Sequence, residues 1–344
     1  MGLRTGNALE WGIGSQAYPQ IFIIFLFLFS LLFFLLAGKE NAFLRGMQRI
    51  AAYELCFVLY DTLLLLAFDL LSFIFHFHLL TRAWLVAAAA LLSMLLLLYG
   101  SIHARNLRTV SYSVKLDEQY KKAKIVLLSD LHIGIFIGTP YLKKVVERVN
   151  RMEPDLIVIS GDILDGYLPS DQELQSIAGV LRQLHSKFGV YAVSGNHDPA
   201  GTEPKFCRFL KKSGIHFLYN DSVTLDEWNL VGRTGIVDMK GSRIPLAHIL
   251  QYTDPRKPTI VLDHDPQGIR EAVDCGVALI LCGHTHKGQF FPMNIFTKLA
   301  NGSQYFYGYA VNENTQSIIS AGTGFFDMPI RIGTDSEIVE IHVE

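Results

Sequence analysis

Two side chains that could share a metal ion follow directly after an apolar run. The run Ile125-Val126-Leu127-Leu128 leads into Ser129-Asp130-Leu131-His132. Such a run predicts a buried strand, and residues two apart at its end project to the same side. Asp130 and His132 could therefore bind one ion together, although a strand that ends in an ordinary polar loop has the same local sequence.

The same arrangement, an apolar run followed by metal-binding residue types, recurs four more times along the chain. Because ligands bind at the carboxyl ends of strands in open α/β sheets, we expect these strand ends to meet at one rim. Seven nitrogen and oxygen ligands are too many for one structural zinc, and they suit two ions that share a bridging carboxylate. The candidate ligands are Asp130, His132, Asp162, Asn196, His264, His284 and His286.

Glycine precedes three of these candidates, namely Asp162, Asn196 and His284. Because glycine has no Cβ, the backbone at these positions can come close to crowded ions.

Strand-like and helix-like segments alternate from residue 124 onward, which predicts an α/β domain over 124–344. The expected strands are 124–129, 156–160, 190–194, 259–262, 278–282, 317–320 and 337–343, with further short strands between 217 and 232. The expected helices are 141–152, 171–184 and 204–212.

The ordered motifs resemble those of the calcineurin-like metallophosphoesterases, and in particular a bacterial membrane-associated branch of that superfamily. They are Asp130-x-His132, Gly161-Asp162-x-x-Asp165, Gly195-Asn196-His197-Asp198, the single His264 and Gly283-His284-x-His286. Gln289 and the Gly322-Thr323-Gly324 turn add to the likeness. The resemblance implies a layered β-sandwich flanked by helices.

The resemblance also implies how the ligands are shared between two divalent metal ions. One ion would be held by Asp130, His132, Asp162 and His286, and the other by Asp162, Asn196, His264 and His284, with Asp162 as the bridge. Mn²⁺ is the first choice for both sites, and Fe or Zn²⁺ is also compatible with such mixed ligands.

The implied reaction is hydrolysis of a phosphate ester by a metal-activated hydroxide, with no covalent intermediate. His197 would protonate or stabilise the leaving oxygen. Asp165 and Asp198 are candidates to orient the metal-bound imidazoles.

Two positions depart from the family pattern. His264 lies between Asp263 and Asp265, which would make this edge of the centre more acidic. Lys287 follows His286 at a position where the membrane-associated branch commonly has glycine. We expect this lysine to be solvated, because charged residues are mostly exposed.

The first third of the chain predicts an all-α transmembrane region over 1–105 with about three spans, at 21–37, 55–75 and 85–102. A signal peptide is a poorer match to the first run, because the flanking charges and cleavage site are weak. Residues 106–123 are expected to form a polar linker.

Three acidic residues, Glu54, Asp61 and Asp69, share one face of the second predicted span. They could form an ion path, but a polar seam between helices is the preferred interpretation.

Basic residues beside the spans predict the orientation of the chain. Lys39, Arg45 and Arg49 would lie on the same side as Arg105, Arg108 and Lys115. We therefore expect an integral protein of a bacterial inner membrane with an external N-terminus and a cytoplasmic catalytic domain.

These observations predict a membrane-anchored metallophosphoesterase that acts on a phosphodiester or pyrophosphate bond. Because the linker is short, a lipid-linked or membrane-surface phosphate ester is the expected substrate. The resemblance to the membrane-associated branch implies a UDP-acylated sugar as one such substrate. The alternative is a membrane scaffold or sensor that keeps the metal-binding fold without turnover. Membrane lipids are expected partners, and the formal net charge of −2 gives no reason to expect nucleic acid.

Overall fold

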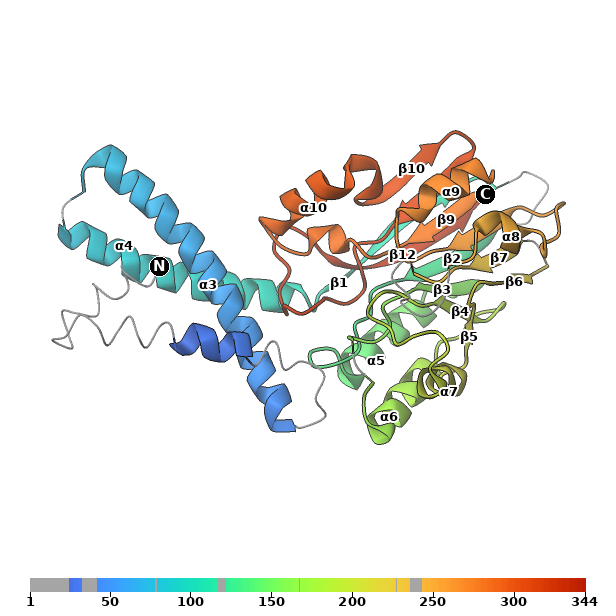
Figure 1. The fold of residues 1–344 in the computed structure, drawn as a ribbon, viewed down its shortest axis with the longest axis horizontal. Coiled ribbons are helices and arrows are strands. Elements are labelled where there is room, and N and C mark those ends of the chain that lie inside the picture. Colours follow the sequence, from blue (N-terminus) through green and yellow to red (C-terminus); the bar gives the residue numbers. More distant parts are fainter. Residues whose placement is uncertain are drawn as a thin grey trace. The chain divides into compact units, whose positions relative to one another are not determined.

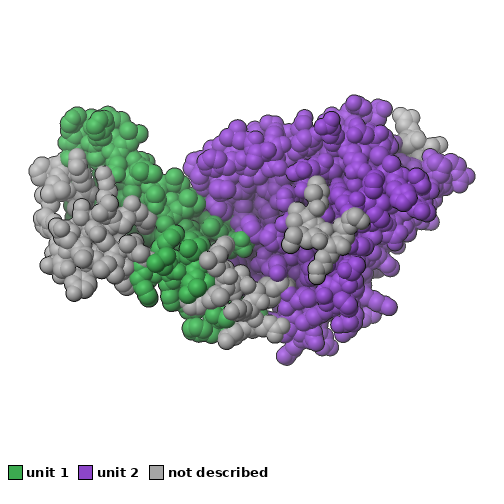
Figure 2. Space-filling view, viewed as in Figure 1, with its two compact units in different colours: residues 1–103, 327–330 green, residues 104–326, 331–344 purple. Residues whose placement is uncertain are grey.

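The computed structural model describes residues 25–32, 42–77, 79–116, 122–166, 168–226, 228–235 and 243–344. The chain divides into two compact units. Unit 1 comprises residues 1–103 with 327–330, and unit 2 comprises 104–326 with 331–344 (Figure 2).

Unit 1 contains two long apolar helices, α3 (Ala42–Phe75) and α4 (Leu79–His103). The segments Phe43–Phe75 and Trp84–His103 are each long and apolar enough to cross a membrane. Helix α3 has 34 residues and is therefore about 50 Å long, which exceeds the hydrocarbon thickness of a bilayer.

Helix α3 thus begins well before the predicted start of the second span at Leu55. Of the first predicted span, only residues 25–32 are described, and they are helical. The rest of that span lies outside the described residues.

A polar contact joins the two long helices of unit 1. The Tyr53 hydroxyl on α3 and the Ser101 hydroxyl on α4 are 2.6 Å apart. Asp61 is 4% exposed, whereas Asp69 is partly exposed. The buried position of Asp61 fits the predicted polar seam better than contact with lipid, because a lipid-exposed carboxylate is costly.

Unit 2 contains two six-stranded sheets. The first has the order β1-β12-β2-β3-β4-β5. Its strands are β1 (Leu107–Val114), β2 (Ala123–Leu128), β3 (Leu156–Ser160), β4 (Val190–Val193), β5 (Ile215–Phe217) and β12 (Ser336–Val343).

The second sheet has the order β10-β11-β9-β8-β7-β6. Its strands are β6 (Asp221–Thr224), β7 (Asn229–Gly232), β8 (Thr259–Leu262), β9 (Leu279–Cys282), β10 (Gly308–Asn312) and β11 (Thr315–Ile319). The helices of this unit are α5 (Thr139–Asn150), α6 (Asp171–Leu181), α7 (Pro204–Lys212), α8 (Leu246–Leu250), α9 (Gly268–Asp274), α10 (Met293–Asn301) and the 3-10 turns η1 (His286–Gly288) and η2 (Ser303–Tyr305).

Figure 1 shows the strands and helices of unit 2 arranged in layers, and the alternation of side chains on the central strands explains this arrangement. On β2, Ile125 and Leu127 enter the core between the two sheets, while Val126 and Leu128 pack into the core beneath α5, α6 and α7. A third core lies between the second sheet and helices α8 and α9. Because the central strands are buried on both faces, their sequences are continuous apolar runs.

The β-sandwich flanked by helices predicted from the family resemblance is therefore present. The structure also places β1 inside the stretch predicted as a linker. Strand β1 pairs in parallel with β12 over its whole length, and this partner lies more than 200 residues away, so no local pattern could indicate the pairing.

Candidate metal centre

The predicted ligands follow strands of both sheets. Asp130 and His132 follow β2, Asp162 follows β3, and Asn196 with His197 follows β4, all in the first sheet. His264 follows β8 and the pair His284 and His286 follows β9, both in the second sheet. The expected rim is thus formed by two facing sheets rather than by one.

The backbone at this rim adopts an uncommon conformation. Five of the seven candidate ligands have positive φ angles: 52° at Asp130, 44° at His132, 50° at Asp162, 73° at His284 and 49° at His286. Such conformations cost about 1–3 kcal/mol each and cluster at functional sites. No sequence signal indicated them, and their concentration here independently marks the site.

Two glycines leave room for neighbouring carboxylates at this rim. A Cβ on Gly195 would collide with the Asp162 side chain, and one on Gly283 would collide with the Asp130 carboxylate. These two positions leave room for the carboxylates to reach the centre.

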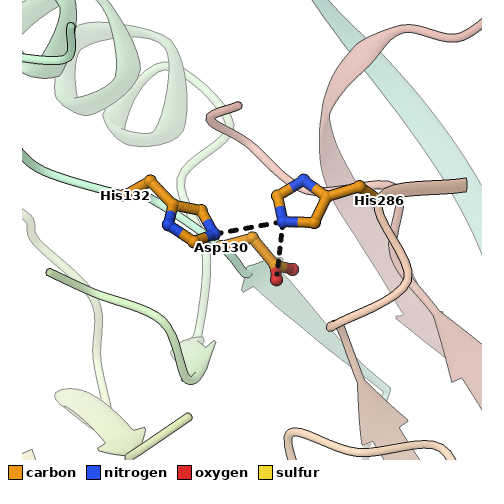
Figure 3. Close-up of side chains that lie close together, drawn as sticks. All are labelled: Asp130, His132 and His286. Carbon is orange, nitrogen blue, oxygen red and sulfur yellow. Dashed lines mark hydrogen bonds and ion pairs between the residues drawn. The ribbon is translucent and has the colours of Figure 1, made fainter. Parts of the chain in front are cut away.

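One group of three candidates is deeply buried (Figure 3). His132 Nε2 lies 3.1 Å from His286 Nε2, which in turn lies 3.3 Å from Asp130 Oδ1. Asp130 is 0% exposed, His132 1% and His286 7%. We call these three residues the deep half of the site.

A second group is more accessible to solvent. The oxygen Asn196 Oδ1 lies 2.8 Å from His284 Nδ1 and 3.1 Å from His264 Nε2, and the two imidazole nitrogens are 3.3 Å apart. His264 is buried, His284 is partly exposed and Asn196 is exposed. We call these three residues the open half.

Asp162 lies between the two halves. Its Oδ2 atom is 3.6 Å from His132 Nε2 in the deep half and 3.2 Å from His264 Nε2 in the open half. Its other oxygen accepts a hydrogen bond from the His197 backbone N–H at 2.8 Å. One carboxylate oxygen is therefore within reach of both groups, as a bridging ligand requires.

The donor set fits cations. The possible metal-binding atoms of Asp130, Asp162 and His264 all lie within 4.8 Å of one another, and so do those of Asp130, His132 and His286. Burial opposes a charge on His264, but the neighbouring Asp162 carboxylate outweighs it and raises the pKa of His264 to about 10. Without a metal, the protonated His264 supplies a positive charge beside the carboxylates. A bound metal ion would supply this positive charge in place of the proton.

Two further histidines have the opposite shift. Burial and the neighbouring His132 and Arg331 hold the pKa of His286 well below its usual value. Burial likewise lowers the pKa of His197. A neutral imidazole is the form that binds a metal, so His286 is ready to do so.

Polar groups behind the ligands fix their orientation. The carboxylate of Asp165 lies 3.1 Å from His132 Nδ1, as predicted. The Ser160 carbonyl lies 2.7 Å from His264 Nδ1, and the His284 backbone N–H donates to Asp130. Partners of this kind are usual behind metal-binding histidines.

Asp198 does not orient an imidazole, so that prediction was wrong. Its two oxygens accept the backbone N–H groups of Leu164 and Gly195, at 2.8 and 2.9 Å. Asp198 therefore ties the loop after β3 to the loop after β4. Both carboxylate oxygens of Asp198 accept hydrogen bonds from backbone N–H groups. The spacing of residues in the sequence does not indicate such backbone partners.

The acidic edge expected around His264 is also neutralised in part. Asp263 is fully buried and forms ion pairs with Arg233 at 3.4 Å and with Arg243 at 2.5 Å. Its negative charge is therefore compensated behind the site.

His197 lies beside the deep half and is partly exposed. Its ring centroid is 5.1 Å from that of His132 and 4.7 Å from that of Phe326. The Phe326 ring also contacts His132 and His286, so it covers one side of the histidine cluster. This position allows His197 to face a substrate without being one of the predicted ligands.

Two more residues lie near the centre. Arg331 had no predicted role, and Lys287 was expected to be solvated. Arg331 is fully buried and donates to the carbonyls of His286, Ala321 and Gly324. Lys287 is partly buried, with its ammonium 4.0 Å from the Tyr307 ring centroid, rather than free in solvent. The contacts of Arg331 with His286 and of Lys287 with Tyr307 could not be predicted from local sequence, because these partners are distant along the chain.

Known proteins resemble this chain. The family profile described as calcineurin-like phosphoesterase matches residues 123–288. A "Transmembrane protein with metallophosphoesterase domain" from Danio rerio is 32% identical over 74% of this chain and 61% of its own length.

Bacterial relatives share the same domain. An "Uncharacterized metallophosphoesterase" from Helicobacter pylori is 34% identical over 67% of this chain and 62% of its own length. "Uncharacterized metallophosphoesterase YkuE" from Bacillus subtilis is 29% identical over 62% of this chain and 77% of its own length. The chain spans about three fifths of the length of the first two relatives. Its second unit therefore contains a calcineurin-like metallophosphoesterase domain.

Proposed function

We propose that this protein is a membrane-associated, two-metal phosphoesterase that hydrolyses a phosphodiester or pyrophosphate bond. The observation that carries the proposal is Asp162 Oδ2, which lies between His132 on one side and His264 on the other. A carboxylate in this position can bridge two ions.

The proposed ligands divide between the two halves. The deep ion is assigned to Asp130, His132, His286 and Asp162, and the open ion to Asp162, Asn196, His264 and His284. Divalent ions here would supply Lewis-acid activation of water and of the phosphate oxygens.

The chain's own residues would perform the remaining tasks. His197 is assigned the stabilisation or protonation of the leaving oxygen, because it is partly exposed and lies beside the proposed ligands without being one of them. Asp165 and the Ser160 carbonyl hold the imidazoles in place. Phe326 limits the access of water to the deep half.

The substrate we propose is a lipid-linked phosphate ester, for example a UDP-acylated sugar. Residues 104–106 alone connect α4 to β1, so the catalytic unit is tethered closely to a helix that can cross a membrane. Arg45 and Arg49 at the start of α3 and Arg105 and Arg108 after α4 would lie on the same side of the membrane if both helices cross it, which supports a cytoplasmic catalytic unit in a bacterial inner membrane. A reporter fused after Glu344 should be protected from protease in intact cells, and a protease-sensitive reporter would refute this orientation.

The activity test uses the full chain purified in detergent. We expect turnover of bis(p-nitrophenyl) phosphate with Mn²⁺, loss of turnover with a chelator, and recovery on adding Mn²⁺. A parallel assay with p-nitrophenyl phosphate and UDP-diacylglucosamine ranks monoester, diester and pyrophosphate substrates. Failure of every substrate with a metal-loaded protein would support an idle scaffold instead.

A further inference from the structure

Helix α10 is unusual because none of its residues is buried. Large apolar side chains on it and just before it are exposed to between 42% and 76% of their surface. We call these residues the α10 patch: Phe291, Met293, Ile295, Phe296 and Leu299. A nine-residue helix is too short to be stable in water without packing, and a contiguous exposed apolar patch marks a binding surface.

The charge around the patch favours an anionic partner. No acidic residue occurs from His286 to Asn312, whereas Lys287 and Lys298 lie within this stretch. Both lysines line a cavity of about 490 Å³ together with Ile295, Leu299 and Phe306. Apolar side chains next to lysines suit a molecule with a negative head group and a hydrocarbon tail.

The position of α10 within unit 2 favours the bilayer as that partner. The start of α10 is connected to segment 331–336, because the Phe291 backbone N–H donates to the Ile332 carbonyl at 2.9 Å. The same segment contacts the residue where the chain enters from α4, since the Ser336 hydroxyl donates to the Ala104 carbonyl at 2.8 Å. The start of α10 and Ala104, the first residue of unit 2, are therefore connected through the same segment of unit 2, and α10 and the start of β1 lie at the same end of unit 2 in Figure 1.

We propose that the α10 patch docks on the bilayer that holds α3 and α4. Phe296 and Leu299 enter the boundary between head groups and acyl chains, and Lys298 lies among anionic head groups. This inference depends on membrane insertion of unit 1, not on catalysis, so it stands or falls separately from the proposed reaction. Its consequence is an additional, non-covalent attachment of unit 2 to the bilayer.

The test measures the depth of a fluorescent label in the full chain. Cysteine replaces Leu299 in a background where the partly exposed Cys207 and Cys275 are serines. The labelled protein is reconstituted into phosphatidylcholine vesicles with a minority of phosphatidylglycerol, with and without brominated acyl chains. We expect a loss of emission at position 299 in the brominated vesicles, because docked apolar side chains lie about 5–10 Å into the lipid boundary.

Two control positions make the result decisive. Lys144→Cys, at an exposed site on α5, should keep its emission, whereas Leu98→Cys, on the exposed surface of α4, should lose it. Equal emission at position 299 in both kinds of vesicle, with free access for acrylamide, would overturn the proposal. Protection of position 299 from both acrylamide and bromine would also overturn it, and would indicate a second copy of the chain on the patch. Loss of quenching at position 98 would refute the membrane insertion on which the proposal depends.

Discussion

The deep and open halves of the candidate centre differ in how the protein surrounds them. In the deep half every ligand is less than a tenth exposed, whereas the open half contains an exposed Asn196 and a partly exposed His284. The deep half is also enclosed by Phe326 and by the buried Arg331. On the proposed assignment, the difference predicts that the open half receives substrate and that the deep half would bind its ion more firmly.

Asp162 is the residue on which both halves depend, so its loss should have the largest effect. We expect Asp162→Asn to lower turnover of bis(p-nitrophenyl) phosphate by about 10⁴-fold or more, because each lost ion removes several kcal/mol of transition-state stabilisation. The matched control is Asp274→Asn, at an exposed position on α9. Turnover within about tenfold of the wild type would contradict a bridging role.

His197 belongs to neither half, so its replacement should affect the catalytic step without affecting metal binding. We expect His197→Ala to lower kcat by about 10²–10⁴-fold, the usual contribution of a general acid, with unchanged metal content. His185→Ala, at an exposed position, serves as the control. If His197→Ala instead loses an ion, His197 is a ligand and the assignment of its role is wrong.

Asp165 supports the deep half alone. Asp165→Asn should weaken metal binding or activity by about 10–100-fold, because His132 loses the carboxylate that orients its ring. Metal titration of the two halves checks this expectation. Equal weakening of both ions would show that the halves are not supported independently.

The open half should respond to pH in the metal-free protein. His264 must lose its proton to bind a metal, and in the metal-free protein its pKa is raised to about 10. Apparent metal affinity should therefore rise with pH, by up to about tenfold per unit below pH 10, as the competing proton is removed. Isothermal titration calorimetry in buffers of different ionisation enthalpy would measure the released proton, and an affinity independent of pH would contradict this explanation.

The same proton has a linked effect on stability. Because the folded pKa of His264 is raised, protonation stabilises the metal-free fold fully below the unfolded pKa of His, and this contribution is lost as pH rises toward 10. Metal binding replaces the lost contribution.

The sequence predicted which residues gather at the candidate centre better than it predicted the contacts that hold them there. Asp130, Asp162 and His264 each follow an apolar strand, and such a pattern is local, so it can be read directly. The two-sheet arrangement, the contact of Arg331 with His286 and the pairing of β1 with β12 join residues far apart in the chain. Helix α10 was missed because its apolar residues are not buried against a core.

The error over Asp198 has the same origin. The motif Gly195-Asn196-His197-Asp198 placed a carboxylate near histidines, but the backbone N–H groups of Leu164 and Gly195 lie closer to it. A motif indicates which residues lie near one another, but only the fold shows which hydrogen-bond donors contact each side chain.

Elemental analysis of the full chain, purified without a chelator and reloaded with Mn²⁺, tests the central claim most directly. We predict two ions per chain in the wild type, one in Asn196→Ala, which removes a ligand of the open half only, and none in Asp162→Asn. A single ion per chain in the wild type, or an unchanged metal content in Asp162→Asn, would contradict a two-metal centre bridged by Asp162.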